Sequence, residues 1–263
     1  MSKVKANGLQ FFYQRFGGDA PTVVFIHGLV IDNLSSWWYT VGNAAAAQGA
    51  DVVCYDLRGH GMSERPLAGY STADNLSDLV GILDELGIDH PVHVVGNSYG
   101  GVIGMALAVA HPERVASLVL VEAHVAVDTH DQAQREQVAV GLDLAGLLLT
   151  EDEVNDWLDT VGGRKLNRMA RNARQLIFDT SLIADLRGSS HFTEGEIAGV
   201  TQPALLVFGE HSDIYDRGVM LRDLLPAGSL HVVADVDHSV LMGATPEVRR
   251  IILDWLAGGF AGG

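Results

Sequence analysis

Residues 92–101 of the chain read VHVVGNSYGG. The run Val92–Val95 has the length and β-branched composition of a buried strand, and the small residues after Gly100 are typical of a closely packed helix. Between them, Gly96, Ser98 and Gly100 form the pattern G-x-S-x-G. A serine in a tight strand-to-helix turn needs neighbours without side chains two positions away on either side. The stretch therefore predicts a turn that presents Ser98, as a nucleophile, at a helix N-terminus.

Other short apolar runs follow the same pattern along the chain. Continuous apolar runs of four to six residues suit strands buried on both faces of a parallel sheet, and helix-like stretches lie between them. We predict an α/β fold with a mostly parallel sheet of about eight strands, which begins with antiparallel edge strands around Leu9–Phe16. The runs are Thr22–His27, Asp51–Tyr55, Ser117–Val121, Ala204–Phe208 and Leu230–Val233, and the helical stretches are Trp38–Gln48, Asn75–Leu86, Gly101–Ala110 and Pro246–Leu256.

Residues 124–200 interrupt this alternation. They contain no convincing strand pattern, and they read as helices over Val138–Leu149, Glu151–Val161 and Leu166–Leu186. We therefore predict a core domain of residues 1–123 and 201–263 with a helical cap, residues 124–200, inserted between two strands. The alternative is a long crossover connection without a role at the site.

Composition excludes several classes of function. Lys and Arg total 17 against 33 Asp and Glu, which gives a net charge of −16 and disfavours nucleic acid and membrane surfaces as partners. The single cysteine, Cys54, excludes an intramolecular disulfide framework and a thiolate zinc cluster. No signal peptide or membrane-spanning run is visible, so we expect a cytoplasmic protein. The chain lacks HExxH and a strand followed by GxGxxG, so we expect no metal and no cofactor.

A serine hydroxyl needs a base, and position selects one of the 11 histidines. If the order is serine, acid, histidine, the base follows the last strand. His238 lies in the loop after Leu230–Val233, at the sheet edge where ligands bind in α/β folds, whereas His231 lies inside that run. His27 precedes the serine, and we expect it to brace its loop by hydrogen bonding.

Several carboxylates could orient this histidine. The loop after Ala204–Phe208 offers Glu210, Asp213 and Asp216, and Glu122 ends the run Ser117–Val121. The residue pattern alone leaves this choice open.

An oxyanion hole requires two backbone N–H donors. Tyr99, directly after the serine, supplies one by its position. The second should come from the turn after the first buried strand, where Leu29 is favoured and Val30 is the alternative.

These motifs together resemble the α/β-hydrolase superfamily, in particular its capped, esterase-like members. His27-Gly28 is similar to the family's oxyanion loop, residues 56–63 (DLRGHGMS) to its D-x-R-G-x-G-x-S turn, and residues 96–101 to its nucleophile elbow. The resemblance implies Asp213 as the acid and His238 as the base, with Glu122 the main rival to Asp213. The dehalogenase and epoxide-hydrolase members carry aspartate at the elbow, so Ser98 argues against both.

The resemblance implies a serine hydrolase that acts by acyl transfer on a small-molecule substrate. Thioester, lactone or carbon–carbon bond cleavage and an acyltransferase or cyclase activity remain alternatives, as does a ligand-binding protein without turnover. Apolar cap residues would line an acyl pocket or pack against the core. We expect Trp37, Trp157 and Phe178 to contact the substrate.

Overall fold

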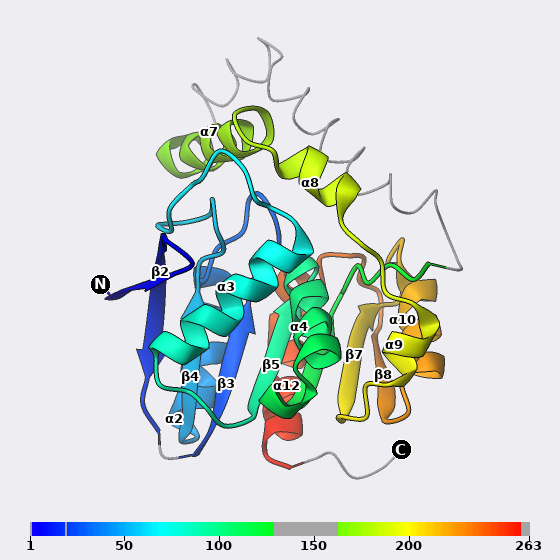
Figure 1. The fold of residues 1–263 in the computed structure, drawn as a ribbon. Helices are drawn as coiled ribbons and strands as arrows, with labels where there is room; N and C mark the ends of the chain where they lie inside the picture. The colour runs from blue at the N-terminus through cyan, green and yellow to red at the C-terminus, as the bar shows by residue number, and fades with distance from the viewer. Residues whose placement is uncertain (1, 19, 129–162, 259–263) are drawn as a thin grey trace.

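The protein is built on one eight-stranded sheet with the order β1-β2-β4-β3-β5-β6-β7-β8 (Figure 1). The computed structural model describes residues 2–18, 20–128 and 163–258. Strand β1 pairs antiparallel with β2, and β2 pairs antiparallel with β4. All other neighbouring strands are parallel. The predicted fold class is thus confirmed. The strands are β1 (Ser2–Ala6), β2 (Leu9–Phe16), β3 (Ala20–Ile26), β4 (Ala50–Tyr55), β5 (Val92–Asn97), β6 (Val115–Val121), β7 (Ala204–Gly209) and β8 (Gly228–Val233).

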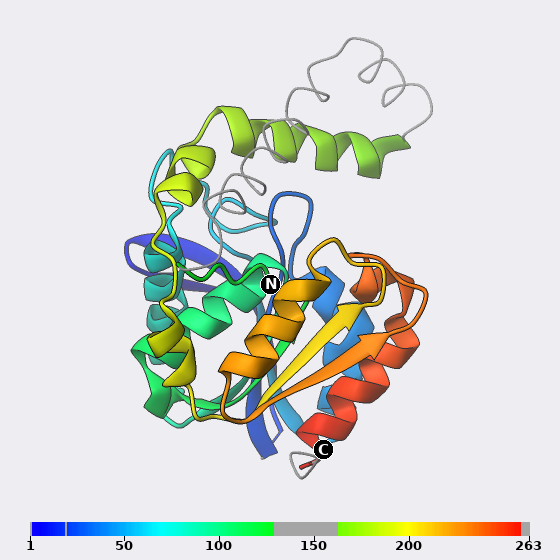
Figure 2. The ribbon, with the colours of Figure 1, turned by 90° about the vertical axis from the view of Figure 1, so that its right-hand side faces the viewer.

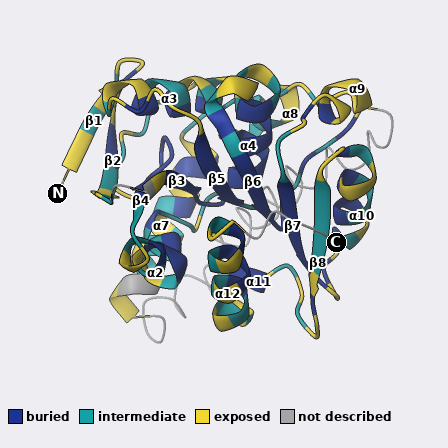
Figure 3. Ribbon diagram, turned by 90° about the horizontal axis from the view of Figure 1, so that it is seen from below, coloured by how far each residue is buried: buried dark blue, intermediate teal, exposed yellow. Residues whose placement is uncertain are grey.

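Helices cover both faces of the sheet (Figure 3). On strand β5, Val94 packs into the hydrophobic cluster on one face and Val95 into the cluster on the other, which explains why the strands are continuously apolar. No helix in the described ranges is both long and apolar enough to cross a bilayer. Helices α3 (Thr72–Glu85), α4 (Tyr99–Ala110) and α10 (Tyr215–Leu224) cover one face, and α2 (Asn43–Ala47), α11 (Val240–Gly243) and α12 (Thr245–Leu256) the other. The short elements α1 (Ser35–Trp37), the π-helical turn η1 (Trp38–Gly42), the 3-10 turn η2 (Pro112–Arg114) and α9 (Glu194–Ala198) complete the described structure.

The predicted helices differ from the structure in places. The stretch Trp38–Gln48 is the π-helical turn η1 followed by α2. The single helix expected over Leu166–Leu186 is two helices, α7 (Gly163–Phe178) and α8 (Leu182–Gly188). Between them the Ser181 N–H donates to the Leu67 carbonyl and not to a preceding helical turn. Helix α10 was not predicted. Its Gly218 lies so close to β7 that a Cβ there would be 2.8 Å from the Phe208 ring. The helices predicted over Val138–Leu149 and Glu151–Val161 lie outside the described residues.

Helices α7 and α8 lie beyond the carboxyl ends of the parallel strands (Figures 1 and 2). They contact the long loop that follows β4: the Asp185 carboxylate accepts from the backbone N–H groups of Gly69 at 3.1 Å and Tyr70 at 2.7 Å. The Ser181 N–H donates to the Leu67 carbonyl at 2.9 Å. The cap predicted over residues 124–200 stays a prediction, since residues 129–162 lie outside the described residues.

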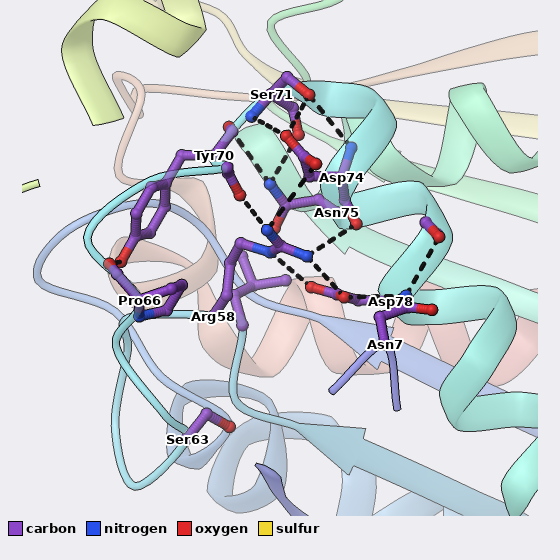
Figure 4. Close-up of polar contacts among 12 residues, drawn as sticks. Asn7, Arg58, Ser63, Pro66, Tyr70, Ser71, Asp74, Asn75 and Asp78 are labelled. Atoms are coloured by element: carbon purple, nitrogen blue, oxygen red, sulfur yellow. Dashed lines mark hydrogen bonds and ion pairs between the residues drawn. The ribbon is translucent and has the colours of Figure 1, made fainter. Parts of the chain in front are cut away.

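Arg58 fixes the same loop from below (Figure 4). Its buried guanidinium donates to both carboxylate oxygens of Asp78 on α3 at 2.6 Å, and to the carbonyl of Gly69. Ser71 and Asp74 form a reciprocal capping box at the start of α3. The arginine of the D-x-R-G-x-G-x-S turn therefore ties the loop after β4 to the first turns of α3, a structural role.

Candidate active site

Ser98 occupies a strained turn between β5 and α4. Its φ of 52° and ψ of −116° lie in a region that residues with a side chain rarely adopt. A Cβ at Gly96 would lie 2.4 Å from the backbone of Gly100, and one at Gly100 would lie 2.2 Å from the Ile26 carbonyl oxygen. Since real Cβ atoms do not approach so closely, the predicted steric need for both glycines is confirmed.

Glu122 lies beside this turn on the neighbouring strand. Asn97 and Val121 are register partners on β5 and β6, so Ser98 and Glu122 are the next residues along two adjacent strands. The Ser98 N–H donates to the Val121 carbonyl at 2.8 Å. Glu122 also has a positive φ, 50°, and is fully buried. Two strained residues with polar side chains thus lie side by side at the carboxyl edge of the sheet.

The buried Glu122 carboxylate accepts three hydrogen bonds. The Gly209 N–H donates to one oxygen at 2.6 Å, and the other oxygen accepts from the Ser212 hydroxyl at 2.6 Å and from His238 Nδ1 at 2.9 Å. These donors come from the end of β7, the loop after it and the loop after β8. Such a set of donors holds an ionised carboxylate in one orientation inside the protein.

The carboxylate of Glu122 controls the proton position on His238. Its hydrogen bond raises the pKa of His238 above the ordinary value despite partial burial, with additional contributions from the negative charges of Glu122, Asp213 and Asp237. Because Nδ1 carries the donated proton, the neutral ring presents its lone pair on Nε2, as a general base requires. Within the described part of the chain, the Ser98 hydroxyl makes no hydrogen bond to His238; catalytic contacts are often long without substrate.

The three carboxylates of the loop after β7 do not contact His238. Asp213 is exposed and acts on His238 through its charge, while Glu210 accepts from the Asp235 N–H and Asp216 lies exposed in the first turn of α10. The predicted pairing of Asp213 with His238 is therefore corrected to Glu122. The physical reason is that Ser212, not Asp213, is the loop residue that turns inward, where it donates to Glu122.

Sequence reasoning missed His124, which packs edge-on against the His238 ring with 5.5 Å between the ring centroids. Burial lowers the pKa of His124 to about 3, and the nearby Arg217 acts in the same direction. Arg217 Nη1 lies 3.2 Å from His124 Nδ1, so the neutral ring accepts this hydrogen bond. No pattern in the sequence marks His124, because it follows the strand end by only three residues and lies at the start of the loosely patterned region.

The turn after β3 offers three consecutive backbone amides. The Gly28 N–H donates to the Asp32 carboxylate at 2.8 Å, and the Val30 N–H donates to His60 Nε2 at 2.8 Å. Both amides that flank Leu29 are thus used within the protein. This pattern favours Leu29 over Val30 as the donor to a bound oxyanion.

Two buried histidines brace this turn. His27 donates from Nδ1 to the Gly28 carbonyl at 2.7 Å and accepts the Leu57 N–H at 3.0 Å on Nε2, which confirms its predicted role. Burial, with His27 nearby, lowers the pKa of His60 to about 3. The neutral His60 can therefore accept the Val30 N–H while its Nδ1–H donates to the Arg58 carbonyl at 2.8 Å.

Tyr99 is the first residue of α4, so its N–H has no acceptor in a preceding helical turn and faces the end of the helix where negative charge is favoured. Its buried hydroxyl lies 3.4 Å from Asn75 Nδ2, and burial raises the pKa of the phenol to about 12. The side chain is thus a neutral anchor, and the backbone is the part available to the site.

The predicted substrate contacts separate into three cases. Trp37 is fully buried, packs against Phe25 and donates to the Ile26 carbonyl at 2.9 Å, so it is a core residue rather than a substrate contact. Phe178 is exposed at the end of α7. Trp157 lies outside the described residues. The neighbouring Trp38, half-buried, lines a cavity that residues of α7 also line.

In the described ranges, one group has side chains placed closely enough for a cation. The ligand atoms of Glu210, His211 and Asp235 lie within 4.8 Å of one another, and all three residues are exposed. Exposed acidic groups of this kind are common without an ion, so we assign no metal role to them.

Comparisons with known proteins agree with the fold described above. A family model described as the alpha/beta hydrolase fold matches residues 21–154. The chain is 29% identical over 265 residues to 2-hydroxy-6-oxononadienedioate/2-hydroxy-6-oxononatrienedioate hydrolase 2 of Pseudomonas putida, covering 94% of this chain and 92% of the relative. It is 43% identical over 115 residues to the dihydrolipoyllysine-residue acetyltransferase component of the acetoin cleaving system of Cupriavidus necator, covering 44% of this chain but 30% of that relative. The crystal structure of the enol-lactonase from Burkholderia xenovorans LB400 shares the fold, with a TM-score of 0.75, 23% identity and coverage of 97% of this chain and 100% of that one.

Proposed function

Since the chain belongs to the alpha/beta hydrolase fold family, a family of hydrolases, we propose that it is a serine hydrolase that cleaves a carboxylic ester, or a related acyl bond, of a small and mainly apolar substrate. One observation carries the proposal: the strained Ser98 turn lies at the start of α4, one strand away from the buried Glu122 that holds His238 in a defined tautomer. A structural turn would need neither the strain nor the oriented histidine.

The reaction proceeds through an acyl-enzyme. Ser98 Oγ attacks the substrate carbonyl while His238 Nε2 takes its proton, and the negative charge of Glu122 stabilises the imidazolium. The oxyanion accepts from the N–H groups of Tyr99 and Leu29. His238 then protonates the leaving alcohol, and a water activated by the same nitrogen releases the acid.

Hydrolysis of p-nitrophenyl esters from acetate to decanoate tests the proposal. We expect turnover by the wild type, loss of at least about three orders of magnitude in kcat for Ser98→Ala, and no change for Ser77→Ala, an exposed serine on α3. The chain-length optimum would report the size of the acyl pocket.

A serine-directed fluorophosphonate covers the case in which no simple ester is turned over. Labelling of the wild type and not of Ser98→Ala would support an active nucleophile with a narrower substrate range, such as a thioester, a lactone or an activated carbon–carbon bond. Absence of both turnover and labelling would overturn the proposal in favour of a ligand-binding protein.

A further inference from the structure

A cavity of about 590 Å³ lies between the core and α7, a size typical of small-molecule sites. Its described lining includes Val30 and His60 but neither Ser98 nor His238. Because the Val30 N–H donates to His60, the cavity wall is continuous with the turn that carries Leu29. The cavity is therefore next to the candidate catalytic residues without being formed by them.

Two arginines face this cavity and have no carboxylate partner among the residues that the structure describes. Arg65 Nε donates to the Gly59 carbonyl at 3.0 Å, and its Nη1 donates to the Gln175 side-chain oxygen at 2.8 Å, so both acceptors are neutral. Arg168, exposed on α7, forms no ion pair with any described residue. In a chain of net charge −16, two cations that form no ion pair with a described carboxylate, both in one cavity, indicate a site for an anion.

The acidic residues of the cavity wall form no ion pair with these arginines. Asp56 is buried, and its two carboxylate oxygens accept the N–H groups of Leu34 and Met62, each at 2.8 Å. Asp32 accepts the N–H groups of Gly28 and Asn33, each also at 2.8 Å. Both carboxylates are thus directed toward backbone donors of the β3 and β4 loops, and neither is paired with Arg65 or Arg168.

Part of the wall is apolar and open to solvent. Ile31, Tyr39 and Met62 all line the cavity, with 62%, 74% and 50% of their surface exposed. Trp38 and Met169 add further apolar surface from η1 and α7. Exposed large apolar side chains gathered around one cavity mark a binding surface, and together with the arginines they specify a ligand with an apolar body and an anionic end.

We propose that this cavity binds an organic carboxylate, with the carboxylate paired to Arg65 and Arg168 and the hydrocarbon part packed against Ile31, Trp38 and Met62. The carboxylate is either the second end of a substrate whose acyl group reaches Ser98 or a separate acid. Only the first case rests on the proposed function.

Calorimetric titration in the Ser98→Ala background tests the site without any need for turnover. Octanoate should bind at least tenfold more tightly than octanamide, which has the same length and no charge. Arg168→Gln should abolish that difference, and Arg65→Gln should weaken it. Arg171→Gln is the matched control, because Arg171 is exposed on the same helix and does not line the cavity. Equal affinity for octanoate and octanamide, or an Arg168→Gln protein that binds like the control, would overturn the proposal.

Kinetics then separate the two sources of the carboxylate. Mono-p-nitrophenyl esters of the dicarboxylic acids from adipate to sebacate are compared with p-nitrophenyl esters of the fatty acids of equal length. A preference of tenfold or more for a hemi-ester that is lost in Arg168→Gln and kept in the control Arg171→Gln assigns the carboxylate to the substrate. Charge-selective octanoate binding without that preference assigns it to a separate ligand. If no ester is hydrolysed and the fluorophosphonate does not label Ser98, the proposed function fails, and the titration still decides whether the site exists.

Discussion

His238 donates from Nδ1 to the fully buried carboxylate of Glu122 at 2.9 Å, across the ends of two strands that are not neighbours in the sheet. Strand β7 lies between them, and its last residue, Gly209, donates to the other oxygen of the same carboxylate. The acid thus comes from the strand directly beside the serine, so the serine turn and the histidine are connected through one buried charge. This arrangement makes the two candidate acids, Glu122 and Asp213, experimentally separable.

Glu122→Gln should lower kcat/KM for a p-nitrophenyl ester by about 10² to 10⁴, because the neutral amide neither fixes the tautomer of His238 nor stabilises its imidazolium. Asp213→Asn, at an exposed position, should stay within about threefold of the wild type. Both proteins should be checked by thermal unfolding so that a folding defect is not read as a catalytic one. A larger loss in Asp213→Asn than in Glu122→Gln would restore Asp213 as the acid.

The pH dependence of the same reaction reports on the contact directly. A general base works only when neutral, so activity falls as the pH drops through the pKa of His238. Since the hydrogen bond to Glu122 raises that pKa, the acidic limb of kcat/KM should lie at a higher pH than an ordinary imidazole gives. In Glu122→Gln the limb should move to lower pH, and in Asp213→Asn it should move less. An unchanged limb in Glu122→Gln would contradict the assigned pair.

The sequence predicts the parts of the site that depend on local sterics. Gly96, Ser98 and Gly100 could be identified because a tight turn between a strand and a helix allows few residues at those positions. The acid could not be selected in this way. Which of several carboxylates turns inward depends on how β6, β7 and β8 align, and Glu122 is distinguished only as a charged residue that ends an apolar run.

The remaining differences have a similar cause. Trp37 and Trp38 are adjacent and equally apolar, and only the helical turn that contains them sends Trp37 into the core and Trp38 toward the cavity. Helix α10 carries little amphipathic pattern because Gly218 packs directly on the Phe208 ring, so close approach replaces an apolar side chain. Such differences depend on how the elements pack against one another, and the periodicity of apolar residues in the sequence does not predict them.

Gly100→Ala should destabilise the protein by about 1–3 kcal/mol or more, because the added Cβ would lie 2.2 Å from the Ile26 carbonyl oxygen and the turn would have to shift. Ester hydrolysis should fall as well, since the same shift displaces Ser98. Gly17→Ala is the matched control: nothing lies within 4 Å of a Cβ there, and its unfolding free energy should change by less than about 1 kcal/mol. Urea unfolding followed by circular dichroism measures both, and equal stability of the two variants would refute the steric account.

His60, which braces the turn after β3, should make the stability of the protein sensitive to acid. Its pKa in the folded protein is about 3, whereas an exposed imidazole in the unfolded chain titrates near ~6.5. Between these values the unfolded chain holds a proton that the folded protein does not, so the free energy of unfolding should fall as the pH is lowered from about 6.5 toward 3, by up to ~1.4 kcal/mol per pH unit for this residue. His60→Gln removes this contribution, and its unfolding free energy should therefore decline less steeply than that of the wild type between pH 6 and 4. His111→Gln, at a surface position, is the control. Urea unfolding across this range measures the slopes. A His60→Gln protein with the wild-type slope would show that the pKa of His60 does not differ between the folded and unfolded chain as proposed.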